Sequence, residues 1–106
     1  MGIKRDKPPV KSFDTNKEFK HFIESERAWM YDRIYTSIEY AHKIKEDYAC
    51  IFEAKIGETM SVVTMKSHKP EWITSLTLAL KFSENVENYE FCIKISNLIN
   101  SIRTEE

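Results

Sequence analysis

From Thr15 to Asp47 the chain contains neither glycine nor proline, the two residues that most often interrupt a helix. The start of this stretch has the spacing of a capping box, because Thr15 can accept a hydrogen bond from a first-turn amide while Glu18 reaches back to the cap. Apolar residues follow along one stripe at helical spacing: Phe19, Ile23, Met30, Ile34, Ala41, Ile44 and Tyr48. The pattern predicts one long N-terminal helix.

Such a helix would be longer than the domain that contains it. About 32 residues at a rise of about 1.5 Å span about 48 Å, which exceeds the expected width of a compact domain of 106 residues. We therefore expect part of the helix to project or to pair with another copy of the chain. The length of the helix predicts a homo-oligomer.

A second line of large side chains runs along the same stretch, about 100° round the helix from the first stripe. It consists of Phe22, Trp29 and Tyr40, with Arg33 between them. One core cannot easily cover both lines, so we interpret Phe22, Trp29, Arg33 and Tyr40 as a set of anchors for a protein partner. In the alternative interpretation, later segments of the same chain cover both lines.

After Tyr48 the pattern changes to the alternation of a strand. Cys50, Phe52, Ala54 and Ile56 share one face, and residues 59–66 are rich in β-branched side chains. Gly57 and Glu58 suit a two-residue type II′ turn, so we expect a short β-hairpin over about 49–66. The alternative is a continuation of the long helix to Ile56, capped by Gly57.

The last third of the chain is predicted to form two helices. Pro70 suits the first turn of a helix, and residues 71–84 carry a helical apolar face, although their alternation from Leu76 to Phe82 also fits a strand. Residues 86–102 place apolar side chains at intervals of three and four: Val86, Tyr89, Cys92, Ile93, Ile95, Leu98, Ile99 and Ile102. The expected fold is α+β and mostly helical, with a long N-terminal helix, a short β-hairpin and a C-terminal helical hairpin.

The residues Tyr89-Glu90-x-Cys92-Ile93-x-Ile95-x-Asn97-Leu98-Ile99-x-x-Ile102 resemble the second helix of a UVR-type hairpin, the short coiled pair of excision-nuclease subunits and some chaperone-associated proteins. With the first helix, the resemblance covers residues 71–102. The chain has Ser96-Asn97 where that family usually has an Arg-Asp pair. The resemblance implies pairing with other helices and no chemistry. An ordinary helical hairpin that closes the core is the alternative.

Composition indicates one soluble domain preceded by an arm. The chain has 106 residues, 42% of them hydrophobic and only two of them glycine, as in an ordinary globular domain. Residues 1–13 are expected to form a flexible arm and residues 14–106 a single globular domain. The basic side chains of the arm are Lys4, Arg5, Lys7 and Lys11. No apolar run is long enough for a membrane span, and two cysteines without a CxxC spacing indicate a reducing cytoplasm.

No motif in the chain points to catalysis. There is no nucleophile elbow and no glycine-rich phosphate loop, and the two cysteines lie on predicted apolar faces. Glu18-x-x-His21 and Glu39-x-x-His42 have the spacing of bundle metal ligands, but they lie about 31 Å apart on the predicted helix. We therefore expect no enzyme activity, no cofactor and no metal site.

The remaining function is binding. We expect a non-catalytic interaction or regulatory protein that binds a larger protein partner, as an oligomer. One alternative is nucleic-acid binding through the basic arm and nearby aromatic side chains. Another is capture of a nucleotide-type small ligand at an oligomer interface. A small chain rich in lysine, glutamate and isoleucine would also suit a phage regulator.

Overall fold

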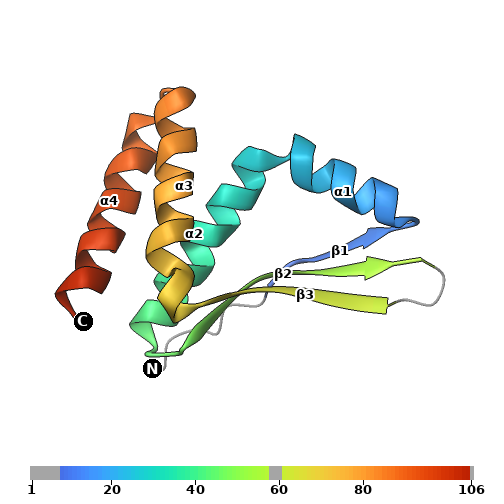
Figure 1. The fold of residues 1–106 in the computed structure, drawn as a ribbon, viewed down its shortest axis with the longest axis horizontal. Coiled ribbons are helices and arrows are strands. Elements are labelled where there is room, and N and C mark those ends of the chain that lie inside the picture. Colours follow the sequence, from blue (N-terminus) through green and yellow to red (C-terminus); the bar gives the residue numbers. More distant parts are fainter. Residues whose placement is uncertain (1–7, 58–60, 106) are drawn as a thin grey trace.

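The computed structural model describes residues 8–57 and 61–105, which form an α+β fold (Figure 1). Three strands make one mixed sheet: β1 (Val10–Phe13), β2 (Tyr48–Ile56) and β3 (Ser61–His68). Two helices connect β1 to β2: α1 (Asn16–Ser25) and α2 (Arg27–Lys43). A short 3-10 turn, η1 (Lys69–Glu71), leads into the C-terminal pair, α3 (Trp72–Asn85) and α4 (Tyr89–Thr104). The expected fold class, α+β and mostly helical, is confirmed.

The N-terminal strand was not expected from the sequence. β1 pairs in parallel with β2, from Val10 opposite Glu53 to Phe13 opposite Ile56, and β2 lies in the middle of the sheet. The boundary of the predicted flexible arm at residue 13 is therefore wrong, because residues 10–13 belong to the sheet. Lys4, Arg5 and Lys7 lie outside the described residues.

The long N-terminal helix is also corrected. It is broken at Glu26, whose backbone leaves the helical region with φ −106° and ψ 48°. α1 turns away from the axis of α2 at this point, so that both helices lie over the same side of the sheet (Figure 1). The break shortens the longest helix to 17 residues and removes the length on which the expected oligomer depended. Chain pairing through this helix has no support from its length.

The predicted β-hairpin is confirmed, with one irregularity. β2 and β3 pair antiparallel from Tyr48 opposite His68 to Ile56 opposite Ser61, and Gly57 follows β2 with φ +76°. The two-residue turn is corrected, because a loop of Gly57 and Glu58 would pair Ile56 with residue 59, whereas the strands pair Ile56 with Ser61; Glu58 itself lies outside the described residues. The register shifts between Cys50 and Phe52, which leaves Ile51 as the extra residue of a β-bulge.

The bulge changes which side chains reach the core. Simple alternation would place Cys50 with Phe52 and Ala54 on one face. In the structure Ile51 and Phe52 are both buried, together with Ala49 and Ala54, whereas Cys50 is half-buried. The extra residue therefore lets two consecutive large side chains enter the core from one strand.

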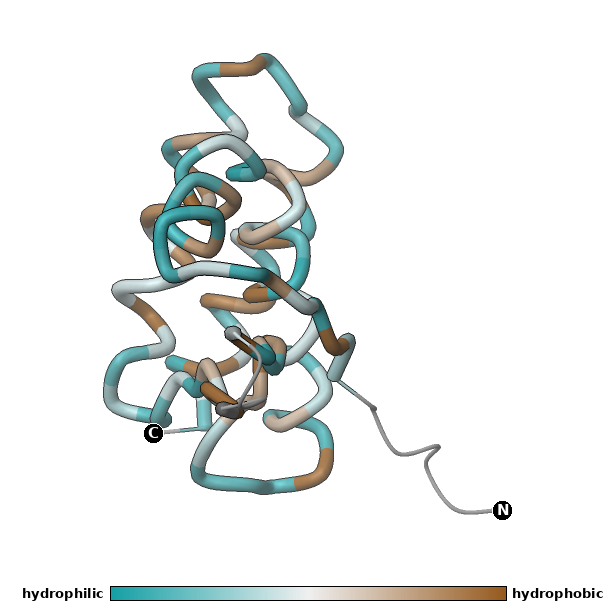
Figure 2. Tube along the Cα trace, turned by 90° about the vertical axis from the view of Figure 1, so that its right-hand side faces the viewer, coloured by the Kyte–Doolittle hydropathy of each residue, from teal (hydrophilic) through white to brown (hydrophobic). Residues whose placement is uncertain are grey.

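The C-terminal helix pair is confirmed, and it closes the larger of two apolar clusters. Trp72, Leu76 and Ala79 of α3 pack with Ile95 and other residues of α4, and with Ile38 of α2. The smaller cluster lies between α1, α2 and the sheet and is centred on Phe52. Within the described part of the chain, none of the helices combines the length and the apolar character that a membrane span needs. Figure 2 shows short hydrophobic and hydrophilic stretches following one another along the trace.

Candidate protein-binding surface

The predicted anchors Phe22 and Trp29 face the protein's own sheet. Their ring centroids lie 5.3 Å apart, and the Trp29 centroid lies 5.4 Å from that of Phe52 on β2. Phe13 of β1 adds a further contact, 5.3 Å from Phe22. Both anchors are half-buried. The chain therefore covers this aromatic line in part, because the break at Glu26 and the unexpected strand β1 bring its own sheet against Phe22 and Trp29.

The other two predicted anchors are not part of this aromatic cluster. Arg33 donates from Nε to the carbonyl oxygen of Ile51 at 2.9 Å and from one terminal nitrogen to that of Cys50 at 3.5 Å. Tyr40 is half-buried further along α2. Eleven residues separate it from Trp29, which corresponds to about 16 Å of helix. The structure therefore does not bring the four residues together as one surface.

Lys11 is the one basic residue of the predicted arm within the described part of the chain. Its Nζ lies 5.2 Å from the Trp29 ring centroid and 5.9 Å from that of Phe22. A cation over an aromatic face is attracted by the ring quadrupole. This contact engages Lys11 with the protein's own core, and it lowers the support for Lys11 as a phosphate ligand.

A different set of apolar side chains is exposed at the free end of the α3/α4 pair. Val86 is 55% exposed, Tyr89 63% and Ile93 62%. Tyr89 and Ile93 are one turn apart on α4 and therefore share a face, while Val86 lies in the connection that precedes Tyr89. We call these three residues the tip surface.

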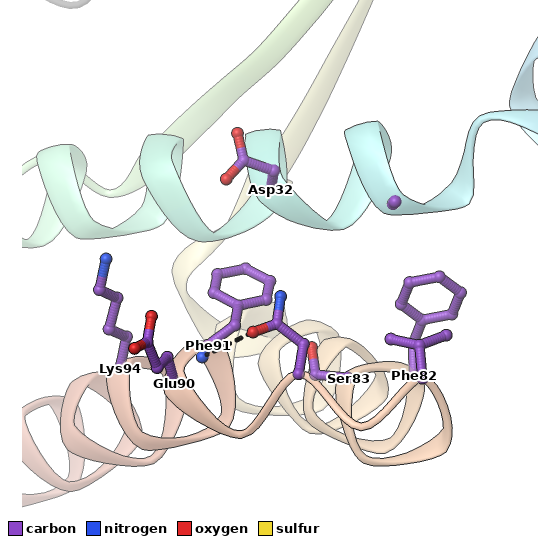
Figure 3. Close-up of a pocket in the computed structure, with 9 residues that line it drawn as sticks. Asp32, Phe82, Ser83, Glu90, Phe91 and Lys94 are labelled. Carbon is purple, nitrogen blue, oxygen red and sulfur yellow. Dashed lines mark hydrogen bonds between the residues drawn. The ribbon is translucent and has the colours of Figure 1, made fainter.

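A pocket of about 370 Å³ opens beside the tip surface. It lies between the start of α2, the end of α3 and the start of α4, and Figure 3 shows Asp32 on one side with Phe82, Phe91 and Lys94 on the other. Its apolar lining comes from Ala28, Phe82, Val86 and Phe91. Val86 thus belongs both to the pocket and to the tip surface, which joins the two into one candidate site.

Aromatic contacts hold the walls of the pocket in place. The Phe82 ring packs on Tyr31 of α2 with centroids 5.0 Å apart, and the Phe91 ring meets Tyr35 edge-on at 5.4 Å. The side chain of Asn88 caps α4 by accepting a hydrogen bond from the Phe91 amide at 3.3 Å (Figure 3). Because both rings are fixed to α2, the pocket is formed before any ligand enters.

The rim of the site is mainly acidic. The charged residues that line the pocket are two carboxylates, Asp32 and Glu90, and one lysine, Lys94. Two carboxylates and one lysine give this lining a formal net charge of −1. A potential of this sign attracts basic groups and repels phosphates.

The residues considered for chemistry are dispersed. Within residues 8–57 and 61–105, no three His, Cys, Asp or Glu side chains gather closely enough to hold a metal ion. His21 is exposed on α1, whereas His42 on α2 lies 3.1 Å from the Ser101 hydroxyl. Cys50 and Cys92 are not joined in a disulfide and lie on different elements, β2 and α4. The two Glu-x-x-His motifs therefore remain separate in the folded chain.

No protein-family model, curated protein or solved structure matches this chain. The resemblance of residues 71–102 to a UVR-type hairpin stays a prediction. The pairing of α3 with α4 is shown independently by the contacts between these two helices described above.

The sequence pattern already contained a signal for the tip surface. Ile93 was counted with the apolar residues of 86–102, but it lies two positions from the buried Ile95. Residues two apart in a helix point to nearly opposite sides. A strict assignment to one face would have separated Tyr89 and Ile93 from the core stripe. The pocket had no such signal, because it depends on how three helices meet.

Proposed function

We propose that this chain is a non-catalytic interaction protein that binds a protein partner through the tip surface and the adjoining pocket. One observation carries the proposal: three apolar side chains are each more than half exposed, and one of them, Val86, also lines a preformed pocket with aromatic walls. Exposed apolar patches with a polar rim are typical of protein interaction sites. Aromatic residues in such patches often supply most of the binding energy.

The charge of the rim defines the kind of partner. A segment with one apolar side chain would place that side chain against Phe82 and Phe91, where water is displaced. Lysine or arginine next to it would meet Asp32 and Glu90 at the rim. The expected partner is therefore a protein segment that carries an apolar residue beside basic residues.

The two alternative functions have weaker support. The acidic rim disfavours a nucleotide as the occupant of this pocket, because its phosphates would be repelled. For nucleic-acid binding, Lys11 is engaged with Phe22 and Trp29. The proposed contacts to a nucleic acid are therefore Lys4, Arg5 and Lys7. Two cysteines that form no disulfide fit a reducing compartment, so a cytoplasmic location is part of the proposal.

Site-specific photo-crosslinking tests the proposal. A benzoylphenylalanine replaces Tyr89 in one protein and the exposed Lys17 of α1 in another, and both are expressed in the native cells. We expect the residue at position 89, and not that at 17, to give one adduct of defined mass. Mapping should place the partner's crosslink next to lysine or arginine. Equal adducts from both positions, or none from 89, would contradict the proposal.

A charge variant with a matched control sharpens the test. Ile93→Glu introduces a carboxylate into the tip surface, whereas Asn97→Glu adds the same charge at an exposed position one turn further along α4. We expect the first variant to reduce the adduct at position 89 by at least about ten-fold, because burying an unpaired charge in an apolar contact is strongly unfavourable. The second should leave it within about two-fold.

A further inference from the structure

The outer edge of β3 is the longest free strand edge in the described part of the chain. The sheet order is β1-β2-β3, so β3 pairs with β2 on one side and with no described strand on the other. β3 has eight residues, whereas the opposite edge strand, β1, has four and follows Pro8 and Pro9. Unpaired backbone groups of a long edge strand form a template for another strand.

This edge has little of the protection that usually prevents strand pairing. Ser61–Met65 contains no charged residue and no proline, and the bulge of the hairpin lies on β2. Val62 is 54% exposed and Val63 38%, and Thr64 is exposed between them and Met65. The single lysine of the strand, Lys66, lies near its end. β3 is therefore a regular, β-branched and largely uncharged edge.

We propose that β3 pairs antiparallel with β3 of a second copy of this chain, about a two-fold axis at Thr64. With a two-fold axis perpendicular to the sheet, the same face of each copy lies on the same side of the joined sheet. Because paired residues in antiparallel strands point to the same side, the axis must pass between two copies of one residue. With Thr64 opposite Thr64 of the second copy, Val63 lies opposite Met65 of the second copy and Val62 opposite its Lys66. The two sheets become one continuous sheet across the molecular two-fold.

The pairs created by this register are all favourable. Met65 packs against the apolar cluster around Phe52, and Val63 lies two residues away on the same face of β3. The pairing of Val63 with Met65 therefore extends that cluster across the axis. On the other face two threonines meet, a pair that stabilises antiparallel sheets. The stem of Lys66 lies beside Val62.

Charge selects this arrangement over the parallel one. In the antiparallel register the two copies of Lys66 are offset by four residues, or about 13 Å. A parallel pairing in register would put them side by side, where like charges repel. The strand is thus complementary to itself, and that complementarity identifies a second copy as its occupant. In Figure 1 the outer edge of β3 lies on the far side of the sheet from β1 and α1.

Disulfide trapping tests the register directly. The variants are made in a Cys50→Ser, Cys92→Ser background. Thr64→Cys then places two thiols opposite each other across the axis. The Cα atoms of paired residues are about 4.5–5.5 Å apart, which lies within the range of about 4.4–6.8 Å that a disulfide spans. Val62→Cys is the matched control, because its two copies are offset by about 13 Å. We expect Thr64→Cys to form a covalent dimer under mild oxidation and Val62→Cys to remain monomeric on a denaturing gel.

Solution mass supplies the second arm. Sedimentation of the wild-type protein should show a monomer–dimer equilibrium. Thr64→Lys, which sets two lysines face to face, should raise the dissociation constant at least about ten-fold. Ser12→Lys adds the same charge to the other edge strand, β1, and should leave the dissociation constant of the dimer unchanged. A wild-type monomer at millimolar concentration, or equal crosslinking of both cysteine variants, would overturn the proposal. Neither result bears on the tip surface, which lies on other elements.

Discussion

The guanidinium of Arg33 donates a hydrogen bond from Nε to the carbonyl oxygen of Ile51 over 2.9 Å. Ile51 is the extra residue of the β-bulge, which has no partner residue on β3. The donor from α2 thus compensates for a place where the strand ladder is interrupted. Arg33 also donates to the carbonyl of Cys50, so one side chain serves two neighbouring peptide groups.

We expect Arg33→Met to lower the free energy of unfolding by about 1–3 kcal/mol, because it keeps an apolar stem but leaves the Ile51 carbonyl without its donor. Arg33→Lys should restore only part of the loss, since a single ammonium cannot reproduce the fork of the guanidinium. Urea denaturation followed by circular dichroism measures both. Lys20→Met, at an exposed position of α1, should stay within about 0.5 kcal/mol of wild type. Equal stability of Arg33→Met and Lys20→Met would contradict the structural role.

Trp72 should be sensitive to loss of its indole nitrogen. Its side chain is fully buried, and Nε1 donates to the carbonyl oxygen of Ser67 at 2.9 Å. Trp72→Phe leaves that carbonyl unsatisfied and opens a small cavity, so we expect a loss of about 2–4 kcal/mol. Trp29→Phe, at a half-buried site, is the matched control and should lose less than half as much. A similar loss in both variants would show that the hydrogen bond contributes little.

Phe22→Ala distinguishes a core residue from a partner anchor. Phe22 contacts Phe13, Trp29 and Phe52, so we expect a loss of about 1–3 kcal/mol and faster amide hydrogen exchange in α1. Tyr89→Ala removes another aromatic side chain, but one that is 63% exposed, and should change stability by less than about 0.5 kcal/mol. The opposite ranking would return Phe22 to the role of a surface anchor.

Glu87→Gly is expected to stabilise the protein. Glu87 follows α3 with φ +59°, and the amides of Glu87 and Asn88 bond back to the carbonyls of Glu84 and Ser83, as in a Schellman motif. Glycine adopts this left-handed backbone without strain, so we expect a gain of about 0.5 kcal/mol by thermal unfolding. Glu84→Gly, within the helix, should instead lose about 1 kcal/mol. A loss in both variants would contradict strain at Glu87.

Tyr35 should make stability depend on alkaline pH. Burial, the hydrogen bond to Glu39 at 2.7 Å and the charge of that carboxylate raise the pKa of Tyr35 from 10.0 to about 12. The folded state holds the proton more tightly, so this stabilisation is complete below pH 10 and is lost as the pH rises toward 12.

Absorbance titration at 295 nm, as the difference from Tyr35→Phe, measures this pKa. Glu39→Gln should lower it toward 10.0 without restoring that value, because burial is the largest cause and remains. The wild type should also lose more stability than Tyr35→Phe between pH 10 and 12. A phenol that titrates at its ordinary pKa in the wild type would contradict the contact with Glu39.

The elements that the sequence predicted correctly have strong local signals. Alternation and Gly57 predict the hairpin, and Pro70 and the spacing of Ile95, Leu98 and Ile102 predict the C-terminal pair. The two missed features have no such signals. No glycine or proline marks the break at Glu26. β1 has only four residues, and their pairing depends on β2, which lies far along the chain.

The candidate site was the least predictable feature. Phe22 and Trp29 were expected at a surface because a straight helix leaves them uncovered, and a single backbone departure at Glu26 returns them to the core. The end of α2 was hidden for a related reason, since Lys45 takes the left-handed position that glycine usually fills. Tertiary contacts decided each of these cases.

The parallel pairing of β1 with β2 has a consequence for the order in which the chain acquires its structure. Val10 finds its partner Glu53 only 43 residues later, whereas Ile56 meets Ser61 almost at once. Closing the longer loop costs more conformational entropy, and contacts distant in sequence form slowly. During synthesis β1 leaves the ribosome before every other element described here, and it must wait for the middle strand before it can join the sheet.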